Sequence, residues 1–259
     1  MPLLEGKTAL IFGVANERSL AWAIAQALAR EGARIVLAYQ ERMERLVRRL
    51  ATEIPDTLLI RCDVQDDQQL DAVFAEVAAV FDGGLDILIH SVAFAPRQEL
   101  ENRFWQTTRE GFQTTMDIST YSLIATARRA LPLMQARGGG SILTSTYMAS
   151  ERVISEYKVM AIAKSALECS IRYLAGELGE YNIRVNAVSP GPVNTLAARG
   201  VSGFIDFLDD FNKKAPLHRI VEQSQVGDAA LFLCSPLAHA ITGEILHVDS
   251  GYNIMDTFA

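Results

Sequence analysis

Two residues with complementary chemistry, Tyr157 and Lys164, lie seven positions apart. In a helix, seven steps of about 100° return a side chain to within about 20° of its starting direction, so both would share one face. A nearby ammonium favours the phenolate and lowers the pKa of a tyrosine. The phenol can donate to an oxygen on which negative charge develops. The pair is therefore a candidate catalytic site; a core tyrosine and a solvated lysine are the alternative.

A turn rich in small residues, 13–21, is a candidate phosphate site. Small side chains let backbone N–H groups approach a pyrophosphate at a helix N-terminus, where the helix dipole favours negative charge. Ser19 is placed to cap the helix and to bind phosphate with the same hydroxyl. Only Gly13 is a glycine, so the spacing departs from Gly-x-Gly-x-x-Gly, and a tight strand-to-helix turn remains the alternative.

Residues after the second and third apolar runs are candidates for contacts with a dinucleotide. Gln40 can hydrogen-bond a ribose hydroxyl without carrying charge, which favours NADH. Arg42 could accommodate a 2′-phosphate, so NADPH remains an alternative. Asp63 can meet an adenine amino group, and Val64 can pack beside the ring. The alternatives are a solvated strand end for Gln40 and a helix cap for Asp63.

The elements that must position these residues alternate along the chain. Short apolar runs predict strands over 8–12, 34–38, 58–61, 85–90, 141–144, 184–188 and 245–248. Amphipathic runs predict helices over 20–30, 44–53, 68–81, 115–134, 159–178 and 226–233. Strands this apolar are buried on both faces, as in a parallel sheet covered by helices. We predict an α/β fold: one Rossmann-type domain over 1–259, with a doubly wound parallel sheet flanked by helices.

Ligands of such sheets bind beyond the carboxyl ends of the strands, where the candidate residues fall. Tyr147 follows the fifth predicted strand and points to the same edge. His90 ends the fourth strand, and we interpret it as a structural histidine. The segment 191–216 is the longest without a strand pattern, which is typical of a lid over a ligand.

Composition excludes several classes of protein. The hydrophobic fraction is 49% and the charged fraction 21%, which indicates a globular chain. The net charge of -7 argues against a nucleic-acid partner. Three well-separated cysteines and no signal-peptide pattern favour a reduced, cytoplasmic compartment. No membrane-spanning run and no local metal motif are visible.

The whole chain resembles the short-chain dehydrogenase/reductase superfamily and, within it, the enoyl-acyl-carrier-protein reductases. The segments that carry the resemblance are 13–21, 90–96, 147–153, 157–164, 191–197 and 242–252. Commoner superfamily members have Tyr-x-x-x-Lys and a serine about thirteen residues before the tyrosine. This chain has Ala161 and Thr144 at those positions, and Tyr-x6-Lys with a second tyrosine resembles the enoyl reductases. In the late loop Pro190 and Asn194 depart from the family's usual pattern, which bears on loop geometry and cofactor preference.

The resemblance implies NADH-dependent reduction of the trans-2 double bond of an enoyl thioester on acyl-carrier protein, in fatty acid elongation. It implies catalytic roles for Tyr157, Tyr147 and Lys164 and a substrate contact at Ala95. The cofactor contacts that it implies are Gly13, Ser19, Leu20, Gln40, Asp63, Val64, Val92, Lys164, Val193, Asn194, Thr195, Leu196 and Ala197. It also implies a homotetramer that buries the C-terminal segment 244–259.

The late segment offers two further features for this substrate. Its apolar residues, Leu208 and Phe211 among them, suit the lining of an acyl-chain channel, with an ordinary helix packed on the core as the alternative. A basic run suits an acidic carrier protein, although such a run is also typical of a solvated face; it consists of Lys213, Lys214, His218 and Arg219.

Three other functions stay open at this stage: a ketone or alcohol reductase of the same superfamily, a non-catalytic dinucleotide sensor, and reduction of coenzyme A thioesters. The first would want Tyr-x-x-x-Lys with a serine partner. The second would predict loss of Tyr157 or Lys164, and both are present. Chain-length preference, the share of NADPH and the exact role of Tyr147 are undetermined.

Overall fold

A single parallel sheet organises the chain. The computed structural model describes residues 2–193 and 204–255 and orders the strands β3-β2-β1-β4-β5-β6-β7. The strands are β1 Thr8–Phe12, β2 Arg34–Tyr39, β3 Leu58–Arg61, β4 Ile87–His90, β5 Gly140–Ser145, β6 Ile183–Pro190 and β7 Ile245–Val248. All pairings between neighbouring strands are parallel, so the predicted doubly wound Rossmann-type sheet is confirmed.

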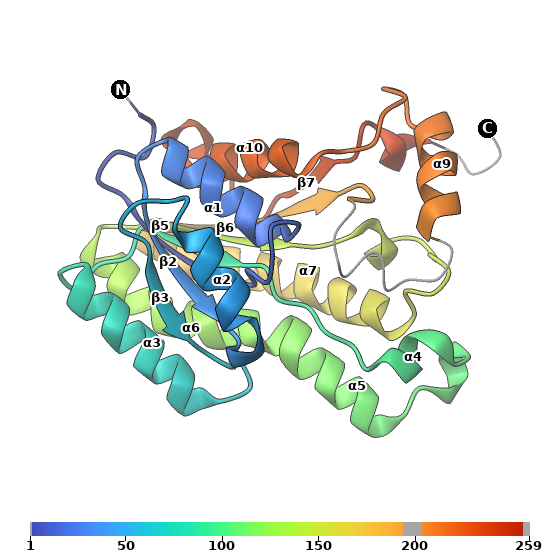
Figure 1. Cartoon of the computed structure of the whole chain (residues 1–259), viewed down its shortest axis with the longest axis horizontal. Coiled ribbons are helices and arrows are strands. Elements are labelled where there is room, and N and C mark those ends of the chain that lie inside the picture. The colour runs from blue at the N-terminus through green and yellow to red at the C-terminus, as the bar shows by residue number, and fades with distance from the viewer. Residues whose placement is uncertain (1, 194–203, 256–259) are drawn as a thin grey trace.

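Helices cover both faces of the sheet (Figure 1). The α-helices are α1 Leu20–Arg30, α2 Glu44–Ala51, α3 Asp67–Val80, α4 Arg97–Glu101, α5 Arg109–Met116, α6 Ser122–Ala136, α7 Val159–Leu178, α9 Phe204–Lys214 and α10 Gln223–Cys234. Short 3-10 turns lie at Glu41–Met43, Phe104–Gln106, Met148–Ser150, Gly179–Tyr181, Pro236–Ala238 and Tyr252–Ile254. The part of the chain that the structure describes contains no helix that is both long and apolar enough to span a bilayer.

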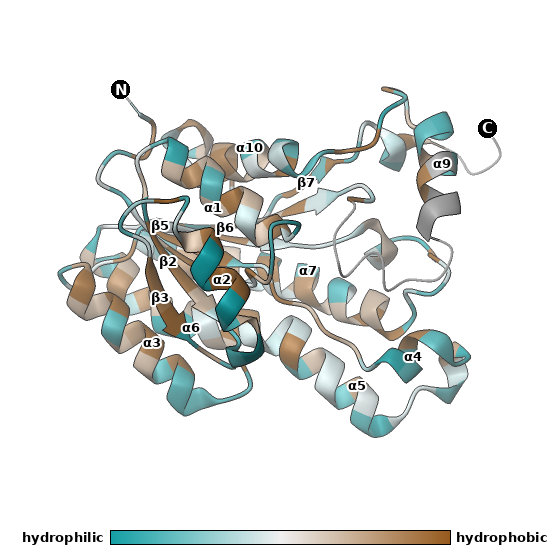
Figure 2. Cartoon of the chain, in the orientation of Figure 1, coloured by the Kyte–Doolittle hydropathy of each residue, from teal (hydrophilic) through white to brown (hydrophobic). Residues whose placement is uncertain are grey.

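Alternate residues of the strands enter two separate hydrophobic layers. In β1, Ala9 and Ile11 pack with α1, α2 and α10, while Leu10 and Phe12 pack with α3, α6 and α7. Successive strand side chains point to opposite faces, so a strand that is apolar at every position must be covered twice. Figure 2 shows the strands as brown ribbons, whereas α2 and α4 are mostly teal.

The strand order changes direction beside β1, which places the ligand crevice. β1 pairs with β2 on one side and with β4 on the other, and Phe12 at its end pairs with His90. The connections after β1 and β4 therefore leave to different sides, and a crevice opens outside their carboxyl ends.

The predicted helix 115–134 is confirmed as helical along its whole length, but it is not one regular α-helix. Instead, α5 and α6 are joined by a π-helical turn, Asp117–Tyr121. Side chains of this turn bond outside the helix: the Ser119 hydroxyl bonds the backbone of Phe94, and the Thr120 hydroxyl donates to the carbonyl oxygen of Ala163 at 2.9 Å. Hydroxyls that bond neighbouring segments favour a local departure from α-helical geometry, and π-turns are frequent at functional sites.

The segment 191–216 contains a helix, α9, whose end is anchored in the core. Phe211 is fully buried and stacks on Tyr252, with ring centroids 4.6 Å apart. For Phe211 the alternative of an ordinary helix packed on the core is therefore correct, and this ring does not line an open channel. Leu208 is half-buried.

Candidate active site

The predicted cofactor residues follow successive strands along one edge of the sheet. In spatial order, Asp63 and Val64 follow β3, Gln40 follows β2, Gly13 follows β1, Val92 follows β4, and Val193 follows β6. Because the strands are parallel, these residues lie at the same carboxyl edge. Asn194, Thr195, Leu196 and Ala197 lie outside the described residues.

The turn after β1 requires its glycine. Gly13 has φ +104°, and a β-carbon there would overlap the backbone carbonyl of Ser91, which follows β4. The absence of a side chain lets the two turns at the switch point approach closely. Leu20 then begins α1, with Ser19 at its N-cap position.

Ser19 does not cap α1 with its side chain, so that prediction is wrong. Its hydroxyl turns back into the preceding turn, donating to the Asn16 carbonyl and accepting from the backbone N–H groups of Ala15 and Asn16 at 3.3 and 3.4 Å. The hydroxyl closes the turn on itself and leaves the first N–H groups of α1 without that cap.

Gln40 and Arg42, which we predict to discriminate between NADH and NADPH, interact with each other. The Nε of Arg42 donates to Oε1 of Gln40 at 3.0 Å.

Asp63 accepts from the backbone N–H of Gln65 at 3.1 Å, and Asp66, not Asp63, is the N-cap of α3. The helix-cap alternative for Asp63 is therefore wrong.

Two tyrosines meet at the carboxyl edge. The rings of Tyr147 and Tyr157 are 4.9 Å apart between centroids and inclined by 48°. Tyr147 follows β5, whereas Tyr157 lies in the turn before α7, which begins at Val159. The prediction of one helical face for Tyr157 and Lys164 was therefore wrong: only Lys164 is in the helix.

Burial raises the pKa of both phenols well above the usual range. A smaller rise comes from Tyr147 for the pKa of Tyr157, and from Tyr252 for the pKa of Tyr147. Removing a phenolate from water disfavours its charge. The predicted lowering of the Tyr157 pKa by Lys164 is not found. With its pKa raised, the Tyr157 side chain keeps its hydroxyl proton at neutral pH and is able to donate a hydrogen bond.

Lys164 is a buried ammonium at the end of β5. It is 5% exposed, and its Nζ donates to the carbonyl oxygen of Ser145 at 2.7 Å. Burial lowers its pKa to about 8, and the charge of Glu168 opposes that shift. Glu168 lies one helical turn further along α7 and accepts a hydrogen bond from the hydroxyl of Thr146. Sequence reasoning missed Glu168, although a carboxylate four residues after a lysine is the available signal.

His90 is structural, as predicted. It is fully buried, and its ring nitrogens bond the hydroxyls of Thr144 at 3.1 Å and Ser122 at 2.7 Å. Burial lowers its pKa to about 3, with a smaller contribution from the charge of Lys164. The hydroxyl of Thr144, at the position of the superfamily's serine, is thus engaged with a core histidine.

The predicted substrate residue lies in a tethered segment. Ala95 is half-buried next to Phe94, whose backbone N–H and carbonyl both bond the Ser119 hydroxyl, at 2.9 and 3.0 Å. The π-helical turn therefore holds the segment that carries Ala95.

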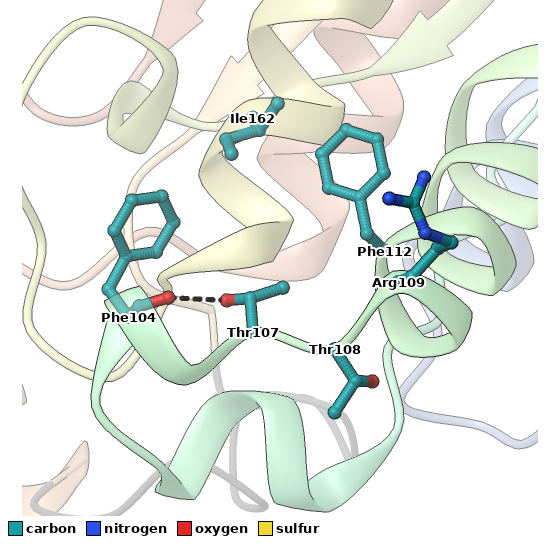
Figure 3. Close-up of a pocket in the computed structure, with 6 residues that line it drawn as sticks. All are labelled: Phe104, Thr107, Thr108, Arg109, Phe112 and Ile162. Atoms are coloured by element: carbon teal, nitrogen blue, oxygen red, sulfur yellow. Dashed lines mark hydrogen bonds between the residues drawn. The ribbon is translucent and has the colours of Figure 1, made fainter.

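A pocket of about 330 Å³ lies away from these residues, between α5, α7 and the preceding 3-10 turn. Figure 3 shows Phe104 and Phe112 on either side of Ile162, with the Thr107 hydroxyl donating to the Phe104 carbonyl at 2.6 Å. None of the predicted site residues lines it. Residues 2–193 and 204–255 contain no group of three or more His, Cys, Asp or Glu side chains suited to a metal ion.

Comparison with known sequences assigns the family. The family described as Enoyl-(Acyl carrier protein) reductase matches residues 13–253, which include both tyrosines and Lys164. The chain belongs to this family. The family assignment agrees with the resemblance carried by the Tyr-x6-Lys spacing.

Relatives from distant bacteria match over nearly the full length. An NADH enoyl-acyl-carrier-protein reductase of Bacillus cereus is 46% identical over 98% of this chain and 100% of its own. One from Synechocystis is 48% identical over 97% of this chain and 98% of its own.

Solved structures of family members share the fold. The Bacillus cereus enoyl-acyl carrier protein reductase with NADP+ and indole naphthyridinone superposes with a TM-score of 0.96 at 46% identity, covering 99% of this chain and 100% of that one. The Anaplasma phagocytophilum reductase in complex with NAD has a TM-score of 0.94 at 44% identity, covering 98% and 97%.

Proposed function

We propose that this protein is an NADH-dependent enoyl-acyl-carrier-protein reductase, which reduces the trans-2 double bond of enoyl thioesters in the fatty acid elongation cycle. The observation that carries the proposal is the pair Tyr147 and Tyr157, with Lys164 buried beside the end of β5, next to the β1–β4 switch point. The full-length similarity to NADH-dependent reductases supports it.

The turn after β1 fits a dinucleotide. Gly13 removes the side chain that would separate this turn from Ser91, and the N-terminus of α1 faces the same edge. Backbone N–H groups and the helix dipole there suit a pyrophosphate. Gln40, Asp63, Val64 and Val92 would hold the adenosine and ribose parts. Since Gln40 is uncharged, we favour NADH; Arg42 beside it leaves some use of NADPH open.

NADH, when bound, supplies a hydride to the β-carbon of the substrate. Residues of the protein then stabilise the negative charge that develops on the thioester oxygen. Tyr157 donates a hydrogen bond to that oxygen, because its high pKa keeps the phenol protonated. Lys164, whose pKa of about 8 leaves it charged at neutral pH, holds the ribose hydroxyls.

The second tyrosine and the late segment would shape the substrate site. Tyr147 packs against Tyr157 and either positions the acyl chain or assists protonation of the α-carbon. Ala95 would contact the substrate, and 191–216 would act as its lid. The exposed Lys213, His218 and Arg219 would receive an acidic carrier protein.

We further propose a cytoplasmic homotetramer. Apolar side chains exposed in the single chain support assembly: Trp105 is 80% exposed, Tyr173 70% and Ile254 75%. Ile254 belongs to the C-terminal segment that we expect to be buried. Light scattering after size exclusion should give four times the chain mass; a monomer would contradict this part of the proposal.

Oxidation of NADH in the presence of an enoyl thioester tests the function. The assay would follow absorbance with crotonyl- or longer enoyl-carrier protein, beside the coenzyme A thioester, NADPH and a β-ketoacyl thioester. We expect rapid oxidation with the enoyl substrates alone, faster on carrier protein than on coenzyme A. Turnover of the ketoacyl substrate alone would instead assign a ketone reductase. Binding of NADH without either turnover would indicate a sensor.

A further inference from the structure

The turn that carries Tyr157 has an unusual backbone. Both neighbours of this tyrosine have positive φ, +65° at Glu156 and +43° at Lys158, and neither is a glycine. Such conformations are costly for residues with long side chains and persist only where other contacts hold them. The backbone of the turn makes three hydrogen bonds of its own: the Tyr157 N–H bonds the Ile154 carbonyl at 3.3 Å, and the N–H groups of Met160 and Ala161 bond the carbonyls of Tyr157 and Lys158 at 2.9 Å.

The side chain of Lys158 supplies contacts from outside the turn. Its Nζ donates to the carbonyl oxygens of Leu100 and Glu101, the second at 3.1 Å, and pairs with the Glu156 carboxylate at 3.1 Å. The Lys158 side chain is only 17% exposed, so this ammonium is largely withdrawn from water. Figure 1 shows α4 beside the start of α7.

The two carbonyls are the last of α4, which ends at Glu101. The final carbonyls of a helix have no partner within the helix, and a cation there is favourable. Hydrogen bonds to a charged group are stronger than those between neutral groups. Lys158 therefore connects the end of α4 and the carboxylate of Glu156 to the backbone turn that contains Tyr157.

We infer that Lys158 is a positioning residue for Tyr157. Its ammonium clamps the Tyr157 turn to α4, which directly follows the segment that contains Ala95. The clamp sets where the phenol points relative to the thioester oxygen. This inference rests on the proposed function, because it assigns Lys158 a role through the donor Tyr157.

The test compares Lys158→Met and Lys158→Arg with the unmodified enzyme. Lys158→Met keeps an unbranched stem and loses every hydrogen bond, and we expect kcat on an enoyl thioester to fall about tenfold, since small misplacements of a catalytic group are costly. NADH affinity, measured by fluorescence titration, should stay within about twofold. Lys158→Arg keeps the charge and the donors and should retain most of kcat.

Lys7→Met is the matched control. Lys7 also makes a 2.8 Å ion pair across elements, with Asp86, but at the opposite edge of the sheet. This variant should lose thermal stability and keep its kcat. A merely structural role for Lys158 would give the same pattern, and that result would overturn the inference.

A double-mutant cycle with Tyr157→Phe distinguishes an effect of Lys158 through Tyr157 from a general loss of activity. If Lys158 acts through Tyr157, adding Lys158→Met to Tyr157→Phe should reduce the remaining kcat by less than about twofold. Losses that multiply would overturn the inference, as would a Lys158→Met enzyme with unchanged kcat. If Lys158→Met does not fold, Lys158→Gln takes its place in the same cycle. Absence of turnover in the unmodified enzyme would instead contradict the proposed function.

Discussion

The turn after β1 and the turn before α7 serve the same edge of the sheet but are held in different ways. The first is closed by its own residues, through the Ser19 hydroxyl and the backbone of Ala15 and Asn16. The second has two strained residues around Tyr157 and is tied to α4 by Lys158. The cofactor turn thus depends on local contacts, and the tyrosine turn depends on a distant one. Four predictions test that difference.

The largest effect should follow Tyr157→Phe. The variant loses the donor to the thioester oxygen, and loss of one such donor costs about 10²–10³-fold in turnover. NADH affinity should be nearly unchanged, because the lost contact is made in the transition state. Steady-state kinetics beside NADH titration checks this. An enzyme with full turnover would exclude the role assigned to Tyr157.

Gly13→Ala should damage the cofactor turn. The new β-carbon would press on the Ser91 backbone, and φ +104° is strained for alanine. We expect a loss of about 1–3 kcal/mol in the free energy of unfolding and weaker NADH binding. Urea denaturation and titration would measure both. Gly176→Ala is the control, because a β-carbon there meets nothing within 4 Å; it should be neutral or slightly stabilising.

The charge of Lys164 should appear in the pH profile. Its pKa is lowered to about 8 by burial, so the ammonium is lost as the pH rises through about 8. We expect kcat/KM, which reports the free enzyme, to fall by about tenfold per pH unit above that point. Glu168→Gln removes the charge that raises this pKa and should move the fall to lower pH. A flat profile to about pH 9.5 would contradict the assignment.

The smallest effect should follow Arg42→Ala. Arg42 is exposed and bonds Gln40, so its loss should change stability little. We expect kcat/KM with NADPH to fall by up to about fivefold and that with NADH to stay constant, because an arginine beside the ribose accommodates a 2′-phosphate. Equal changes with both cofactors would contradict the discriminating role.

The strands and the helices α1 and α7 were predictable from the sequence because their apolar residues follow one regular pattern of burial from end to end. Runs such as 8–12 and 245–248 coincide with β1 and β7 at both ends. The order of residue types after the strands also placed Gly13, Gln40, Asp63 and Val92 at one edge. These predictions needed only the periodicity of side chains and the geometry of parallel strands.

Apart from the local turn around Ser19, the features that the sequence did not predict lie where side chains contact segments far away in the chain. The side chains of the π-helical turn at Asp117–Tyr121 form hydrogen bonds with Phe94 and Ala163. The pKa of Tyr157 is raised by its burial beside Tyr147. The contact between Lys158 and the end of α4 joins residues 57 positions apart in the chain. No local pattern carries such information.

Hydrophobic periodicity and residue chemistry along the chain are enough to predict the sheet, the residues at its carboxyl edge and the Tyr-x6-Lys signature. Three further properties are visible only in the folded chain: Tyr157 lies in a strained turn before α7, burial raises the pKa of its phenol, and the Lys158 side chain bonds the end of α4. These properties depend on burial and on contacts between distant segments, which exist only once the chain has folded.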